Sequence, residues 1–475
     1  MISINDDQPS LHCSINSVES VEFWVGNAKS FVKCYLQPLQ YKVIGIFQSP
    51  SSTRTQYVAV NKRTLEALAE QQQSNGKTAV EGGELPTLPY QSILVTTSVR
   101  PGSDQSFYSM LQSHSGDFVK SVTFNCHNVK AVHDNAVSHG AISIQSPSSS
   151  NTTFGKEIKT TTSTIQSPFK DITHSFVSRS LVNNNNNNNN NNKNNNNIVQ
   201  LSTYESILKY YYPQFRPITK ELFKEDFNDL ELNPAGQYIH SIDHIATCIV
   251  HGTMDEYVKW YQDCLKFNLL SVQEGAREEI PVIVEKKEEL NFFNIKVDED
   301  IGLKMVVLSN QPAHSKSHLP TIMWVMSEGF ENGKGQVEQY LDFNGGSGIQ
   351  HLAFNTSDIY KAVNYARSKY GQMEFIEAPD TYYDNLKNRK ELDFILSTLS
   401  QCEIDNLKTF RILIDSDYSI ESIDKFILQI FTKPIGDSPT LFFELVQRCG
   451  AIGFGKGNIK ALFEAVEMQR KKDQF

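Results

Sequence analysis

Residues 348–371, GIQHLAFNTSDIYKAVNYARSKYG, have the pattern of a strand, an asparagine-containing turn and a helix. Residues 118–141, FVKSVTFNCHNVKAVHDNAVSHGA, have the same pattern. A second matching pair begins with VESVEFWVGNAK at Val18 and with IDHIATCIVHGT at Ile242, and each member gives a short strand, a loop and an amphipathic helix. Because the two pairs occur in the same order, we infer a duplicated chain in which each half contains two strand–helix–strand modules.

Histidines occupy the starts of these modules in one half only. His244 corresponds to Ser20, and His351 corresponds to Ser121. Two imidazoles placed in this way favour a metal site that one half contains and the other lacks. The alternative is that both histidines satisfy hydrogen bonds in the core, which is the usual role of a lone buried histidine.

Glu444 is the carboxylate best placed to complete such a site. In TLFFELVQR, residues 440–448, the alternation of a strand puts Phe442, Glu444 and Val446 on one face. A carboxylate among apolar neighbours is costly to bury without a cation, and metal ligation removes that cost. Two histidines and one carboxylate form the ligand set of mononuclear iron(II) oxygenases. The alternative is a salt bridge between Glu444 and Arg448.

Neighbouring segments offer groups that could face a substrate. The strand FILQIFTKP puts Gln429 and Phe431 on one face, and an amide beside an aromatic ring suits an aromatic substrate with a polar tip. GFGKGN, residues 453–458, has the pattern of a glycine turn before a C-terminal helix, residues 456–475, that is capped by Asn458. We expect this helix either to cover the site as a lid or simply to pack on the core.

The composition indicates an acidic protein without an extended apolar segment. The chain has 44 Lys and Arg residues against 54 Asp and Glu residues, and no basic stripe follows any expected helix, so nucleic acid is not an expected partner. No window reaches the roughly 18–20 apolar residues of a membrane span, so no membrane association is expected. The seven cysteines are scattered without a CxxC pair, which together with the polar N-terminus favours a cytoplasmic location.

A polar tract separates the two halves. Residues 147–200 combine a Ser/Thr-rich stretch with a run of asparagines, and they lack an apolar period that could offset the entropy of ordering. The expected organisation is a metal-free N-terminal domain at 15–146, a disordered linker at 147–200, an iron-binding domain at 238–455 and a C-terminal helix at 456–475.

Several segments resemble the 4-hydroxyphenylpyruvate dioxygenase family of the vicinal oxygen chelate superfamily. They are VEFWVGNAK at Val21, IDHI at Ile242, YLDFNGGSGIQHLAF at Tyr340, APDTYYDNLKNR at Ala378, ILID at Ile412, LQIFTKPIGDSPTLFFELVQR at Leu428 and GFGKGNIKALFEAVE at Gly453. They extend over nearly the whole chain outside 147–200. The resemblance implies an α+β fold of two tandem glyoxalase/bleomycin-resistance-like domains, whose paired βαβββ modules form open barrels, with a C-terminal lid helix.

The resemblance also implies the chemistry of the site. It assigns one Fe(2+) per chain to His244, His351 and Glu444, which the repeat and the strand face indicate independently. Around the substrate and the lid it implies Gln336, Gln350, Gln429, Phe431, Phe442, Phe454 and Asn458. The implied reaction uses O2 to decarboxylate and oxygenate an aryl 2-oxo acid, and the first candidate is 4-hydroxyphenylpyruvate to homogentisate in tyrosine catabolism. A homodimer or homotetramer is the implied assembly.

Three alternatives remain at this point. The chain departs from the family pattern near Met305, in PTIMWV from Pro320 and at Ile459, which allows a paralogue that makes 4-hydroxymandelate or uses another 2-oxo acid. A second alternative is a non-catalytic binding or regulatory module, against which the intact ligand set argues. A third is a related metalloenzyme, such as a ring-cleaving dioxygenase or a glyoxalase-type isomerase, which would not share the FTKPIGDSPTLFFELVQR run.

Overall fold

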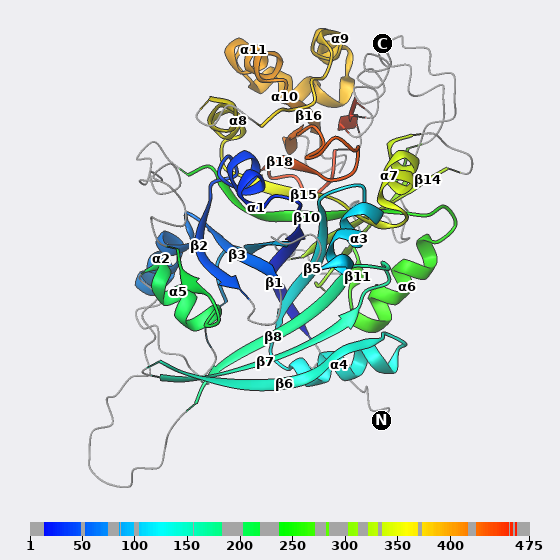
Figure 1. Ribbon diagram of the computed structural model, residues 1–475. Coiled ribbons are helices and arrows are strands. Elements are labelled where there is room, and N and C mark those ends of the chain that lie inside the picture. The colour runs from blue at the N-terminus through cyan, green and yellow to red at the C-terminus, as the bar shows by residue number, and fades with distance from the viewer. Residues whose placement is uncertain are drawn as a thin grey trace, which may run out of the picture.

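The computed structural model of the protein contains two large mixed β-sheets, one from each half of the chain (Figure 1). The structure describes residues 14–48, 53–74, 85, 87–98, 104–154, 156–182, 203–218, 237–270, 282–284, 303–311, 322–330, 335–368, 373–416, 424–455, 457–458 and 461–462. The two sheets and their helices confirm the predicted α+β fold with two related, open halves.

The first half forms a nine-stranded sheet in the order β6-β7-β8-β5-β1-β4-β3-β2-β9. Its strands are β1 (Ile15–Trp24), β2 (Tyr41–Gln48), β3 (Arg54–Asn61), β4 (Ser92–Ser98), β5 (Phe118–Cys126), β6 (Ser143–Phe154), β7 (Lys156–Gln166), β8 (Thr173–Leu181) and β9 (Arg216–Pro217). Its helices are α1 (Ala28–Phe31), which continues as a π-helical turn over Val32–Leu36, α2 (Thr64–Ser74), α3 (Gln105–Ser113), α4 (Val129–Ser138) and α5 (Tyr204–Tyr211).

The second half forms a sheet in the order β11-β13-β14-β10-β15-β18-β17-β16, and β12 also pairs with β13. Its strands are β10 (Ile239–Ile249), β11 (Asn268–Leu269), β12 (Val282–Val284), β13 (Leu303–Ser309), β14 (Met323–Gly329), β15 (Gly348–Thr356), β16 (Leu413–Ser416), β17 (Phe426–Phe431) and β18 (Phe442–Cys449). Its helices are α6 (Met254–Leu265), α7 (Gln336–Asn344), α8 (Ile359–Ser368), α9 (Asp380–Asp384), α10 (Asp393–Thr398) and α11 (Gln401–Phe410).

The predicted duplication is visible in the pairing of the strands. In the first half β1 pairs parallel with β4 and antiparallel with β5, and β5 pairs parallel with β8. In the second half β10, β14, β15 and β18 repeat these three relations. Even the irregularities correspond, because the β1–β5 register shifts after Glu22 and the β10–β15 register shifts after Ala246. The two halves therefore share one strand topology and one register.

The segment expected to be a linker is largely folded. Strands β6, β7 and β8 pair in sequence and add to the edge of the first sheet, so the prediction of disorder is wrong for residues 147–154 and 156–181. Threonine is common in these strands and favours extended backbone, because its β-branched side chain fits a pleated surface. The asparagine run from Asn183 lies outside the described residues, and the other domain limits remain predictions.

A shared apolar core holds the two halves together. Phe31, in α1 of the first half, packs on Phe443 of β18 with ring centroids 6.4 Å apart. In the second half, Tyr261 in α6 forms a 2.8 Å hydrogen bond with His174 of β8. Each half thus places its first helix against the sheet of the other half, and Figure 1 shows α4 and α6 side by side. The second half is therefore packed against the first through both of these helices.

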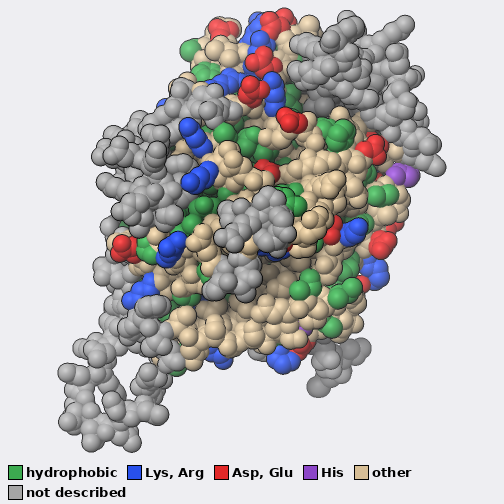
Figure 2. Space-filling view, in the orientation of Figure 1, with side chains coloured by type: hydrophobic (Ala, Val, Ile, Leu, Met, Phe, Trp, Pro, Cys, Tyr) green, Lys and Arg blue, Asp and Glu red, His purple; other side chains and the backbone are tan. Residues whose placement is uncertain are grey.

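The described part of the C-terminal helix is short. Gly457–Asn458 and Ala461–Leu462 are helical, whereas Ile459 and residues 463–475 lie outside the described residues, so the lid helix stays a prediction. On the face drawn in Figure 2, basic and acidic side chains are interspersed rather than gathered in one basic stripe. None of the helices within the described ranges is long and apolar enough to cross a membrane.

Candidate metal centre

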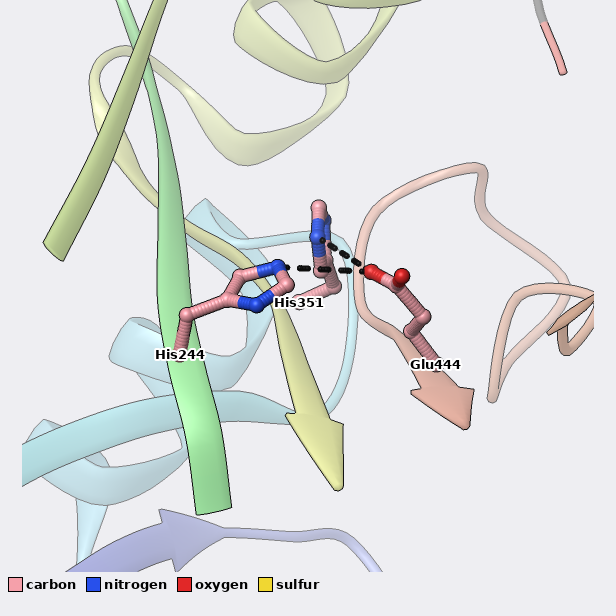
Figure 3. Close-up of side chains that lie close together, drawn as sticks. All are labelled: His244, His351 and Glu444. Carbon is pink, nitrogen blue, oxygen red and sulfur yellow. Dashed lines mark ion pairs between the residues drawn. The ribbon is translucent and has the colours of Figure 1, made fainter. Parts of the chain in front are cut away.

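Three adjacent strands bring His244, His351 and Glu444 together. On β10, His244 stands opposite Ala353 of β15, and Ala353 in turn stands beside Glu444 of β18. His351 lies two residues before Ala353 on the same strand, so its side chain projects from the same face. Figure 3 shows the two imidazoles and the carboxylate pointing toward one another from these strands.

The distances among the three side chains suit one metal ion. The Glu444 Oε2 atom lies 3.3 Å from Nε2 of His244 and 3.3 Å from Nε2 of His351. One candidate ligand atom from each residue lies within 4.8 Å of the other two. Ions bound at about 2.0–2.2 Å by imidazole and carboxylate need donor atoms at separations of this order. The donor set fits iron(II), and the assignment of these residues as its ligands stays a prediction.

Each imidazole is held through its other nitrogen. The Nδ1 atom of His244 lies 2.8 Å from Oδ1 of Asp243, and Nδ1 of His351 lies 3.2 Å from Oε1 of Gln350. An acceptor at Nδ1 favours the tautomer with a proton on Nδ1, which leaves the lone pair of Nε2 free for a metal. Phe442 also stacks on His351, with centroids 4.6 Å apart and planes at 21°.

A chain of side-chain amides fixes the second oxygen of the carboxylate. Gln429 donates from Nε2 to Oε1 of Glu444 at 2.8 Å, and Asn458 donates from Nδ2 to Oε1 of Gln429 at 2.8 Å. The hydroxyl of Tyr382 donates to Oδ1 of Asn458 at 3.1 Å. With Oε1 held in this way, Oε2 is directed at the two histidines.

Of the remaining candidate residues, two aromatic side chains pack beside the ligands. Phe454 meets the ring of His244 edge-on at 5.2 Å, and Phe431 meets Phe442 edge-on at 6.3 Å, so both lie at the site. Gln336 begins α7 and takes part in none of the hydrogen bonds above. The roles of all these residues in binding a substrate remain predictions.

Arg448 has a different partner from the alternative proposed for it. Its guanidinium forms a double hydrogen bond with Asp243, at 2.7 Å from Nε to Oδ2 and 2.8 Å from Nη2 to Oδ1. The contacts of Glu444 are His244, His351 and Gln429. The structure thus pairs Arg448 with Asp243, and the alternative salt bridge between Arg448 and Glu444 is wrong.

The first half carries serine at all three corresponding places. Ser121 stands beside Thr173, and Thr123 beside Ser175, just as His351 stands beside Phe442 and Ala353 beside Glu444. The counterpart of Glu444 is therefore Ser175. Comparing the two halves of the sequence did not identify this counterpart, because Ser175 lies in the segment that was expected to be disordered. Only the strand pairing reveals the correspondence.

Burial makes the charges of the site depend on one another. Burial would raise the pKa of Glu444, but the charge of His244 and hydrogen bonds from both histidines lower it to about 2. Burial would lower the pKa of His244, but the carboxylates of Glu444 and Asp243 raise it to about 9. Burial lowers the pKa of His351, against the opposing effect of Glu444. In the metal-free protein a proton on His244 therefore offsets the charge of Glu444.

We expect the affinity for divalent metal to rise with pH. A metal binds Nε2 of His244 only after its proton leaves, whereas Glu444 is already ionised and His351 already neutral near pH 7. The dissociation constant should therefore fall about tenfold per pH unit between roughly pH 7 and 9 and level off above. Competition with a chelator of known pH dependence measures this, and a flat profile would show that His244 carries no proton in the metal-free protein.

Comparison with known proteins agrees with the fold and with the family resemblance. Residues 241–389 match the family model of the Glyoxalase/Bleomycin resistance protein/Dioxygenase superfamily. The chain is 38% identical to a protein of Dictyostelium discoideum named "Uncharacterized 4-hydroxyphenylpyruvate dioxygenase-like protein", over 98% of this chain and 97% of that protein. It is 31% identical to a 4-hydroxyphenylpyruvate dioxygenase of Xenopus tropicalis, over 78% of this chain and 76% of that protein.

A solved structure supports the architecture. A mutant of 4-hydroxymandelate synthase from Streptomyces coelicolor superposes with a TM-score of 0.63, over 96% of this chain and 99% of that chain. The two sequences are 22% identical, so this likeness concerns the fold. This structural match extends over both halves of the chain.

Proposed function

The chain belongs to the 4-hydroxyphenylpyruvate dioxygenase-like family, and we propose that it uses one iron(II), held by His244, His351 and Glu444, to decarboxylate and oxygenate an aryl 2-oxo acid. The observation that carries this proposal is the convergence of two imidazoles and one carboxylate from β10, β15 and β18, with 3.3 Å between Oε2 of Glu444 and each Nε2. A set of two histidines and one carboxylate leaves metal positions for a substrate and O2.

The protein's own groups prepare and shield the site. When bound, iron would supply the electrons for O2 activation and a charge to hold the 2-oxo acid. Asp243 and Gln350 keep the two imidazoles in the metal-binding tautomer, and Gln429 keeps Oε2 of Glu444 turned toward them. Glu444 is only 1% exposed, so bulk water is excluded from the carboxylate.

Aromatic side chains around the ligands favour an aromatic substrate. Phe431, Phe442 and Phe454 are all buried beside the histidines, and their rings offer edge and face contacts to a phenyl ring. With the names of the related proteins, this supports 4-hydroxyphenylpyruvate as substrate and homogentisate as product. We place this activity in tyrosine catabolism in the cytoplasm, a compartment in which cysteines stay reduced.

The test is anaerobic loading with iron(II), followed by 4-hydroxyphenylpyruvate and O2. We expect one iron per chain, with O2 uptake and CO2 release in equal amounts. Because homogentisate and 4-hydroxymandelate are isomers, chromatography against both standards must identify the product. A chain that binds no iron would overturn the proposal. Iron binding with 4-hydroxymandelate as the product, or with turnover of another 2-oxo acid only, would replace the proposed substrate or product but keep the metal centre.

A further inference from the structure

The ion pair beside the metal centre has a counterpart in the half that has no metal ligands. In the second half Asp243 pairs with Arg448, and both side chains are at most 3% exposed. In the first half Glu19 pairs with Arg179, with 2.7 Å from Nη1 to Oε1 and 2.8 Å from Nη1 to Oε2. This second pair is also buried, with side-chain exposures of 4% and 7%.

The strand register shows that the two pairs are equivalent. Glu19 precedes Ser20 as Asp243 precedes His244, and Ser20 and His244 hold the same place in β1 and β10. Arg179 follows Ser175 by four residues, as Arg448 follows Glu444. The duplicated fold has therefore kept a carboxylate–arginine pair between these strands in both halves, although only one half has metal ligands.

The surroundings of the two pairs differ where the metal ligands differ. Asp243 also accepts a hydrogen bond at Oδ1 from Nδ1 of His244, whereas Glu19 is followed by a serine. Arg448 donates from Nη1 to the carbonyl oxygens of Ile452 and Gly453 at 3.1 and 2.6 Å. In the first half, Arg179 donates from Nη2 to the carbonyl oxygen of Tyr211 at 3.0 Å.

The C-terminal turn reached by Arg448 carries a residue of the site. Phe454 follows Gly453 directly and meets the ring of His244 at 5.2 Å, while the guanidinium of Arg448 lies 5.1 Å from the ring of Phe454. One ion pair thus acts on His244 from two sides, directly through Asp243 and indirectly through Arg448 and Phe454. Asp243 holds its Nδ1 edge, and Arg448 holds the turn that places Phe454 against its ring.

We propose that Asp243 and Arg448 are positioning residues for the metal centre, acting together through His244 and through the turn at residues 451–453. Arg448 fixes the carboxylate of Asp243, and this carboxylate holds His244 in the orientation and tautomer that present Nε2 to the metal. The Glu19–Arg179 pair stabilises the fold of its half but orients no metal ligand. This inference rests on the proposed metal site.

The first half supplies the matched control for the test. Asp243→Asn and Glu19→Gln each replace the carboxylate of one buried ion pair by an amide of nearly the same shape. Both variants are therefore expected to lower the unfolding temperature. Only Asp243→Asn is expected to weaken metal binding, by about 10–100-fold, which is the usual effect of losing an outer partner of a ligating histidine. Binding is measured with cobalt(II) by competition against a chelator, and the absorption spectrum of bound cobalt reports the environment of the imidazoles.

A second pair of variants covers the case in which Asp243→Asn does not fold. Arg448→Lys and Arg179→Lys keep the positive charge but lose the planar double hydrogen bond, and only Arg448→Lys should weaken cobalt binding and alter the cobalt spectrum. Equal affinity in the wild type, Asp243→Asn and Arg448→Lys would overturn the inference, as would equal weakening in the Glu19 or Arg179 variant. If the wild type itself bound no metal, the proposed function would fail instead, so the two failures are distinguishable.

Discussion

Replacing Glu444 by serine is expected to abolish both iron binding and turnover while leaving the fold intact. The carboxylate is the only anionic ligand of the three candidates, and its Oε2 lies 3.3 Å from both imidazoles. Loss of a ligand should cost more metal affinity than the roughly 10–100-fold typical of an outer-shell partner. Serine is the residue at the corresponding place of the first half, Ser175, so the same sheet geometry already accommodates it.

Iron content after anaerobic loading and product formation are the two measurements for the Glu444→Ser variant. Circular dichroism and the unfolding temperature of the metal-free protein verify that it folds. Ser175→Ala is the matched control and should keep the iron content and activity of the wild type, because Ser175 lies in the half without the candidate ligands. Iron bound by Glu444→Ser in the amount of the wild type would contradict the assignment of Glu444.

The internal repeat allowed part of this candidate site to be predicted from the sequence. Strand alternation around Glu444 and the serine-for-histidine pattern at Ser20 and Ser121 depend on local spacing, which a sequence displays directly. The structure brings together the three side chains that this spacing singled out. What local spacing could not supply was the partner of Arg448, because Asp243 is 205 residues away along the chain and becomes its neighbour only through strand pairing.

The segment wrongly predicted to be disordered shows the same limit of local sequence patterns. Residues 156–166, KEIKTTTSTIQ, have few apolar side chains, and that composition alone resembles a disordered tract. In the sheet, β7 is paired on both sides by β6 and β8, and within residues 158–166 only Ile158, Ser163 and Ile165 are buried. Backbone hydrogen bonds to two neighbours and threonine's preference for extended structure stabilise such a strand. Those neighbours are supplied by the sheet and are invisible in composition.

Replacing Arg389 by methionine is expected to destabilise the protein by about 3–5 kcal/mol, which is the usual cost of leaving one member of a buried ion pair alone. Arg389 pairs with Asp415, whose side chain is fully buried, and also donates to the carbonyl oxygen of Ile414 at 3.1 Å. Asp415 accepts the backbone N–H of Gly457 at 2.6 Å, so the pair anchors the start of the C-terminal segment. Chemical denaturation of the metal-free protein measures the change.

The destabilisation of Arg389→Met should depend on pH and on its partner. Burial raises the pKa of Asp415 even with Arg389 present, and removing the arginine raises it further. A raised carboxyl pKa penalises the folded state when the group is ionised, so the loss should be full above the raised pKa and should shrink as pH falls toward about 4. Adding Asp415→Asn should restore much of the stability, since the amide oxygen can still accept a hydrogen bond from the backbone N–H of Gly457.

Arg411→Met is the matched control. Arg411 pairs with Asp380, whose side chain is 57% exposed, so the loss of Arg411 should cost at most about 1 kcal/mol. Equal losses from Arg389→Met and Arg411→Met would show that the buried pair contributes no more than a surface one.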